Sequence, residues 1–230
     1  MAAVKIVTGP DRNSRIMDIT QTIALTMGVA WASGINLYAA ILMLGYLGST
    51  GNIDLPPELQ ILTNPVVMLA AGVMYCIEFF ADKVPGVDTG WDVIQTFIRI
   101  PAGAVLAAGA VGDIGGAAQL AAAIAGGSLA AGSHLTKAGT RVLINTSPEP
   151  FTNWFVSVGE DVAVIAGLWT ALHHPLLFLL LLAVFIMLMI WLLPRIWRGV
   201  RKVLAFLGQL AGISSSGKDN NMPTNNDIRK

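Results

Sequence analysis

The chain has 230 residues, of which 54% are hydrophobic and only 12% are charged, and its mean hydropathy is +0.66. Soluble domains carry roughly 25% charged residues, so this composition excludes an ordinary soluble domain and predicts a protein largely covered by lipid. The formal net charge is zero, and no overall field points to nucleic acid as a partner. The single cysteine, Cys76, excludes an internal disulfide.

Six segments have the length and apolar character of membrane-spanning helices, each of which needs about 20 apolar residues. In chain order they are 19–47, 65–80, 93–111, 117–135, 155–172 and 176–193. The first is unusually long and carries Ser33-Gly34-Ile35-Asn36 at its middle, so we expect it to be tilted, kinked or broken there. The predicted fold class is all-α: a polytopic membrane protein with a helical bundle over residues 19–194.

Lysine and arginine predict the orientation of this bundle, because cytoplasmic connections are enriched in them. With six spans, the connections at 48–64, around Asp113 and at 173–175 fall on one face of the membrane and contain neither residue. The basic positions on the other face are Lys5, Arg12, Arg15, Lys83, Lys137, Arg141, Arg195, Arg198, Arg201 and Lys202. We therefore expect both termini in the cytoplasm, with residues 1–18 as a cytoplasmic segment.

The C-terminal part of the chain divides into two segments. Residues 195–213 form an amphipathic pattern, with apolar side chains at helical spacing and cations on another face. Such a helix is expected to lie on the cytoplasmic leaflet with its cations against anionic lipid headgroups. Residues 214–230 have no apolar periodicity, which predicts a disordered tail.

Two polar segments indicate a weak internal repeat of two helix hairpins. Trp91 and Trp154 each follow a proline by six residues, Pro85 and Pro148 respectively, and each segment opens a predicted span. With six spans both hairpins enter from the same side, which favours a parallel repeat. An inverted repeat would require a different number of spans, and with so few identities chance is an open alternative.

Charged and polar side chains inside the spans mark the candidate site. An unpaired charge in the hydrocarbon costs at least ~2.5–3.5 kcal/mol, so such groups must face one another or water. The candidate residues are Asn36, Glu78, Asp82, Arg99, His134, Arg141, Glu160 and Asp161. One interpretation is a set of structural ion pairs, Glu78 with Arg141 and Arg99 with Glu160 or Asp161. The other is a hydrated cavity that binds an ion, a proton or a small polar solute.

The sequence contains no recognisable catalytic, cofactor or metal motif. A phosphate-binding glycine loop, a His-Glu-x-x-His pair and a nucleophile elbow are missing, and His173-His174 has no third ligand for a metal. We therefore expect no cofactor and no enzyme. The favoured function is a small-solute or ion transporter or channel, acting as a homo-oligomer. The alternatives are a non-transporting membrane scaffold or assembly factor, and an intramembrane enzyme that uses acid pairs for proton chemistry.

Three polar motifs carry a resemblance to a known family. They are Glu78-Phe-Phe-Ala-Asp-Lys-Val-Pro-Gly-Val-Asp-Thr-Gly-Trp-Asp92, His134-x-x-Lys137-x-x-x-Arg141 and Asn145-Thr-Ser-Pro-Glu-Pro-Phe-Thr-Asn153. Over residues 20–172 the chain resembles a bacterial family of multi-pass membrane proteins of unassigned function. The resemblance implies a bacterial inner membrane and assigns no activity. The sixth span and the basic helix lie outside this block and are interpreted as an appended anchor.

Overall fold

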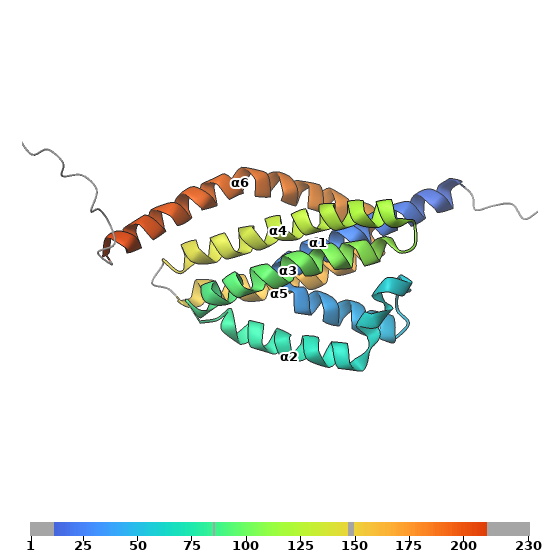
Figure 1. Ribbon diagram of the computed structural model, residues 1–230, viewed down its shortest axis with the longest axis horizontal. Helices are drawn as coiled ribbons and strands as arrows, with labels where there is room; N and C mark the ends of the chain where they lie inside the picture. The colour runs from blue at the N-terminus through green and yellow to red at the C-terminus, as the bar shows by residue number, and fades with distance from the viewer. Residues whose placement is uncertain (1–11, 85, 147–149, 211–230) are drawn as a thin grey trace, which may run out of the picture.

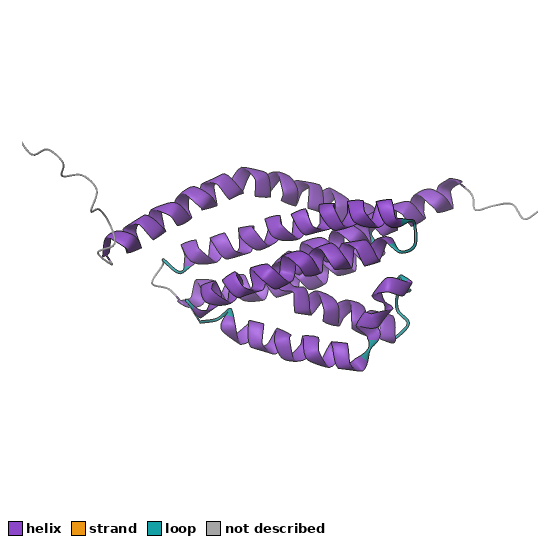
Figure 2. Cartoon of the chain, in the orientation of Figure 1, coloured by secondary structure: helices purple, strands orange, loops and turns teal. Residues whose placement is uncertain are grey.

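The computed structural model describes residues 12–84, 86–146 and 150–210, and every regular element in this part of the chain is a helix (Figure 2). The elements are α1 (Arg12–Ser49), the 3-10 helix η1 (Pro57–Thr63), α2 (Pro65–Ala81), α3 (Val87–Val111), α4 (Gly116–Ile144), α5 (Pro150–His173) and α6 (Pro175–Leu210). The prediction of an all-α fold is confirmed. Pro85, Pro148 and residues 214–230 lie outside the described residues, and the internal repeat stays a prediction.

Four helical segments are long and apolar enough to cross a membrane, which indicates a membrane-embedded protein. They are Asp18–Ser49, Val87–Val111, Phe151–His173 and Pro175–Phe206. The bent pair of η1 and α2 adds a fifth if the two are taken as one span. Helix α4 is long enough, but alanine, glycine and serine make up much of its sequence and lower its hydropathy. The predicted number of six spans is therefore not confirmed.

Helix α1 is broken at Asn36, whose backbone angles (φ −146°, ψ 94°) are not helical. Figure 1 shows the two parts of α1 running in opposite directions, so that α1 begins and ends at the same end of the bundle. Contacts agree with this arrangement. Gln21, before the break, lines a groove with His173 at the end of α5, and Leu59 of η1, after the break, packs on Gly109 near the end of α3.

This re-entrant path changes the expected topology. Helices α2 to α6 run between the two ends of the bundle, whereas α1 enters and returns (Figure 1). The described start of α1 and the described end of α6 consequently lie at opposite ends of the bundle, and the expectation that both termini lie on one face of the membrane is not confirmed. A single long apolar run looks like one crossing in sequence, but the polar break at Asn36 lets the chain fold back inside the protein.

The fold-back can be tested by cysteine labelling in a Cys76→Ser background. Asp18→Cys and Asp113→Cys should react with a membrane-impermeant maleimide from the same side of oriented vesicles, and Arg198→Cys from the other side. All three positions are exposed. Six simple crossings would instead place Asp18 and Arg198 on one side, so joint labelling of that pair would contradict the structure.

Small residues bring α1, α3 and α4 into close contact. A Cβ atom at Gly103 would overlap Ala130 Cβ, and one at Gly126 would overlap Ala107 Cβ. Gly34 of α1 packs in the same way on the backbone of α4 at Ala130. Because glycine lets helix backbones approach closely in lipid, side chains projecting from these helices can meet in a small buried volume.

Helix α6 continues through Pro194 to Leu210 as one helix. Ile196 is buried and packs against Gly139 of α4. The boundary expected at residue 195 is therefore not a break in the helix, although Arg195, Arg198, Arg201 and Lys202 are exposed beyond it, as an amphipathic segment requires.

Candidate functional site

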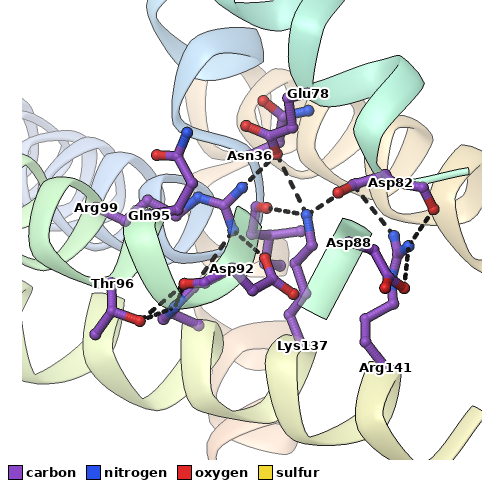
Figure 3. Close-up of polar contacts among 12 residues, drawn as sticks. Asn36, Glu78, Asp82, Asp88, Asp92, Gln95, Thr96, Arg99, Lys137 and Arg141 are labelled. Carbon is purple, nitrogen blue, oxygen red and sulfur yellow. Dashed lines mark hydrogen bonds and ion pairs between the residues drawn. The ribbon is translucent and has the colours of Figure 1, made fainter. Parts of the chain in front are cut away.

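Eight charged side chains form a continuous buried network, which we call the charge network; Figure 3 labels all of them except Glu160. Its cations are Arg99, Lys137 and Arg141, and its carboxylates are Glu78, Asp82, Asp88, Asp92 and Glu160. Their side chains are between 0% and 16% exposed, with Glu160 the most accessible. Helices α2 to α5 all contribute, so the network joins four helices at one point.

Helix α3 presents one polar face to the network. Asp88, Asp92, Gln95 and Arg99 follow each other at intervals of four, three and four residues, which places them on one side of a helix. All four are at most 1% exposed. Arg99 Nη2 donates to Glu78 Oε1, and Arg99 Nη1 lies 3.5 Å from Asp92 Oδ1. The guanidinium of Arg99 therefore links α2 to α3.

Lys137 lies at the centre of the network. Its Nζ is 2.9 Å from Asp82 Oδ2, 3.2 Å from Glu78 Oε1 and 3.5 Å from the Glu160 carboxylate. The same Nζ donates to the main-chain carbonyl of Ile35, at 3.1 Å. That carbonyl precedes the break in α1, so one ammonium group holds three carboxylates and the tip of the re-entrant helix together.

Arg141, one turn after Lys137, binds the acidic residues nearest the end of the bundle. Its Nη2 donates to Glu160 Oε2 at 2.6 Å and to Asp82 Oδ2 at 3.2 Å. Its Nη1 donates to the Asp82 carbonyl at 2.7 Å. Burial alone would raise the pKa of the Asp82 carboxyl, but the charges of Lys137 and Arg141 outweigh burial and lower that pKa below its usual value.

Asp88 is held mainly by amide groups. Asn145 Nδ2 donates to both of its carboxylate oxygens, at 2.8 and 3.0 Å, and Asn153 Nδ2 donates to Oδ2 at 3.2 Å. Arg141 Nη1 lies 3.8 Å away. Asn153 also accepts a hydrogen bond from Arg141 Nη1 at 3.0 Å, so this asparagine connects the start of α5 to the network.

The break in α1 is bound to Asp161 of α5, which also binds α2. Asn36 Nδ2 donates to Asp161 Oδ1 at 2.8 Å, while Asn36 Oδ1 accepts from the Ala39 amide at 3.0 Å. Tyr75 of α2 donates its hydroxyl to Asp161 Oδ2 at 3.2 Å. Asp161 is thus held by hydrogen bonds from neutral groups, whereas its neighbour Glu160 points to the cations of α4.

His134 lies beside Arg99 at the inner end of the network. Arg99 Nη1 is 3.3 Å from His134 Nδ1, and because a guanidinium can only donate, Nδ1 must be the acceptor. The ring proton is therefore on Nε2, which lies 3.1 Å from the Asp92 carbonyl and 2.7 Å from Thr96 Oγ1. This arrangement requires a neutral imidazole.

Carboxylates outnumber cations in this site. Five acids face three cations, an excess of two. Including the nearby Asp161 and the buried Lys83 adds one of each and leaves the excess unchanged. Uncompensated buried charge is costly, so the site is suited to take up protons or another small cation.

Five of the eight residues singled out from the sequence belong to the charge network, His134 binds it through Arg99, and Asn36 and Asp161 bind each other beside it, but the predicted pairing was wrong. Glu78 binds Arg99 and Lys137, not Arg141. Arg99 binds Glu78 and Asp92, not Glu160 or Asp161. The reason is the register between the two helices. Glu78 and Asp82 are one turn apart, as are Lys137 and Arg141, and it is Asp82 that meets Arg141 while Glu78 meets Lys137.

Three members of the network were missing from the predicted set: Lys137, Asp88 and Asp92. The spacing of Asp88, Asp92, Gln95 and Arg99 could have identified the two aspartates, because four polar groups on one face of an apolar helix require a polar partner. Lys137 and Arg141 show the same four-residue spacing on α4.

Comparison with known proteins gives one family and no function. A family model described as "Domain of unknown function (DUF4126)" matches residues 23–195. The match runs through the apolar part of α6, beyond the expected limit at residue 172, so the sixth apolar segment belongs to the domain and is not an appended anchor. No curated protein and no solved structure matches the chain.

Proposed function

Because the chain belongs to the DUF4126 family, a domain of unknown function, we propose a function from the site itself: an ion transporter or channel whose charge network binds protons during its cycle. The observation that carries this proposal is the broken helix α1, whose tip lies among buried charges. Two features of the tip, its backbone and its electrostatics, support it.

A broken helix supplies main-chain groups at membrane depth. Discontinuous helices in transporters place unpaired carbonyls and half-helix ends at the substrate or ion site, and irregular backbone is tolerated only where protein or water satisfies it. Here the Ile35 main-chain carbonyl accepts from Lys137, and next to it the Asn36 side-chain amide donates to Asp161. A movement of the broken tip of α1 must therefore rearrange the contacts of Lys137 and Asp161. In the same way, a change in the charge of these side chains must alter the forces on the tip.

The excess of carboxylates over cations favours the uptake of protons by the charge network. Two negative charges without a matching cation are unstable at 0–16% exposure, and protonation removes them. Glu160 and Asp161 are the most accessible acids of the site. We propose that protons enter through them and that release of a proton from Glu160 reforms its pairs with Lys137 and Arg141.

A non-transporting scaffold is the second candidate, and one observation favours it. The Glu78, Arg99 and Arg141 side chains have no exposed surface, and each is paired. A dry network of this kind fixes helix register without conducting anything. The two candidates differ in whether the acids exchange with water.

Proton flux in vesicles separates them. Vesicles loaded with the pH-sensitive dye pyranine receive a negative-inside potential from valinomycin and a potassium gradient. We expect faster acidification with the protein than without it, and a rate roughly tenfold lower for Asp161→Asn, equivalent to about 1.4 kcal/mol in the barrier. Asp113→Asn, in the exposed turn between α3 and α4, is the matched control and should conduct like the wild type.

The scaffold is favoured if wild-type vesicles acidify no faster than protein-free vesicles. Asp161→Cys in the Cys76→Ser background should then also resist a water-soluble thiol reagent from both sides. Labelling of this variant without proton flux in the wild type would show a wet site that conducts another ion, and would overturn the choice of protons.

We also propose an orientation and an assembly for this transporter. The exposed Arg195, Arg198, Arg201 and Lys202 at one end of the bundle support a cytoplasmic location of that end, because cytoplasmic segments are enriched in lysine and arginine. The ends of α2 and α4 and the starts of α3 and α5 lie at the same end (Figure 1). An inner-membrane location and a homo-oligomer complete the proposal.

A further inference from the structure

A groove of about 490 Å³ lies between α3, α4 and α6 and borders the charge network at Asp92. Its walls are apolar and include Val142 of α4 and Leu193, Pro194 and Trp197 of α6. The base is formed where α6 touches α4 directly: a Cβ atom at Gly139 would overlap Ile196 Cγ2. Trp197 and Pro194 are exposed, so the groove opens toward the lipid side of the bundle.

One carboxylate lies in the lining of this groove. Asp92 is 1% exposed, and neither of its oxygens accepts a hydrogen bond from the part of the chain that the structure describes. Its nearest cation, Arg99 Nη1, is 3.5 Å away and also serves Glu78 through the same guanidinium. A buried acceptor without a donor is costly, so a donor entering the groove would be bound strongly.

The surroundings of Asp92 define the rest of the ligand. Thr96, the next polar residue of the lining, already binds His134 and the Asp92 carbonyl. Asp92 lies in the second turn of α3, near the end of the bundle, and an exposed tryptophan such as Trp197 is typical of the membrane interface. Arg201, an exposed cation, follows Val200 of the groove wall.

We propose that this groove binds an aminophospholipid from the bilayer. The primary ammonium of the headgroup donates to Asp92, the phosphate lies toward Arg201, and one acyl chain follows the apolar wall between Leu135 and Leu193. A quaternary ammonium headgroup has no N–H to donate, and therefore cannot satisfy Asp92. The lipid site does not rest on the proposed proton transport, although Asp92 belongs to both the groove lining and the charge network.

Native mass spectrometry of the full-length protein tests this assignment. The protein in detergent is titrated with phosphatidylethanolamine and with phosphatidylcholine of the same acyl chains. We expect the wild type to prefer phosphatidylethanolamine by roughly tenfold, and Asp92→Asn to bind the two lipids equally. Ala138→Leu, which narrows the groove, should weaken phosphatidylethanolamine alone, while Ala183→Leu, on an exposed part of α6, should change nothing.

Two results would overturn the proposal. One is equal binding of the two lipids by the wild type. The other is a preference that survives in both Asp92→Asn and Ala138→Leu, which would place the lipid elsewhere. If Asp92→Asn does not fold, the comparison of Ala138→Leu with Ala183→Leu decides between these outcomes, because neither substitution removes a charge.

Discussion

Replacing Lys137 by methionine should lower the free energy of unfolding by ~3–5 kcal/mol, the cost of leaving a buried ion network without one partner. Lys137 Nζ lies within 3.5 Å of Asp82, Glu78 and Glu160 and binds the Ile35 carbonyl. Methionine fills a similar volume, so the loss is one of charge and hydrogen bonds rather than of packing. Five carboxylates would then face only two cations. Unfolding in mixed micelles with increasing dodecyl sulfate measures the change.

Lys202→Met is the matched control, because Lys202 is exposed on α6 and the same substitution there should shift the midpoint little. Lys137→Arg keeps the charge but not the shape of the ammonium, and should lie between the wild type and Lys137→Met. A Lys137→Met protein as stable as the control would show that the carboxylates around Lys137 are already protonated in the folded state. Lys137 would then stabilise no negative charge.

The membrane-embedded, all-α character of the protein follows from composition, but the path of α1 does not. Residues 19–47 are apolar for longer than one crossing needs, and Asn36 at their middle correctly indicated a break. The direction after the break depends on contacts made far away in sequence: Asn36 binds Asp161, 125 residues later. A local pattern of apolar residues does not contain this long-range contact. The sequence therefore predicted one crossing for a segment that enters the bundle and returns.

The candidate site could be located, because charges are rare in apolar helices and each requires an explanation. The predicted third span, however, began at residue 93, whereas α3 begins at Val87. Asp88 and Asp92 were therefore assigned to a connection when they lie inside the bundle. Partner choice also depends on the relative register of α2 and α4, which no periodicity within either helix determines. The pairs were consequently misassigned although the members were found.

Double-mutant cycles should show strong coupling between Glu78 and Arg99 and weaker coupling between Glu78 and Arg141. Glu78 Oε1 accepts directly from Arg99 Nη2 in a pair with no exposed surface, whereas Arg141 reaches Glu78 only through Lys137 and Asp82. Residues in direct contact couple by ~0.5–3 kcal/mol, and we expect about 2 kcal/mol for Glu78→Gln with Arg99→Gln. For Glu78→Gln with Arg141→Gln we expect below about 1 kcal/mol.

The single substitutions set the scale for these cycles, since each leaves a buried partner unpaired and should be more damaging than the Glu78–Arg99 double replacement. Free energies of unfolding for the wild type, three single and two double variants are sufficient to obtain both couplings. A larger coupling for Glu78 with Arg141 would restore the pairing inferred from sequence and would require α2 to lie about one helical turn from its position in the structure. Equal, small couplings for both pairs would mean that Glu78 is protonated, with its charge absent from the network before any substitution is made.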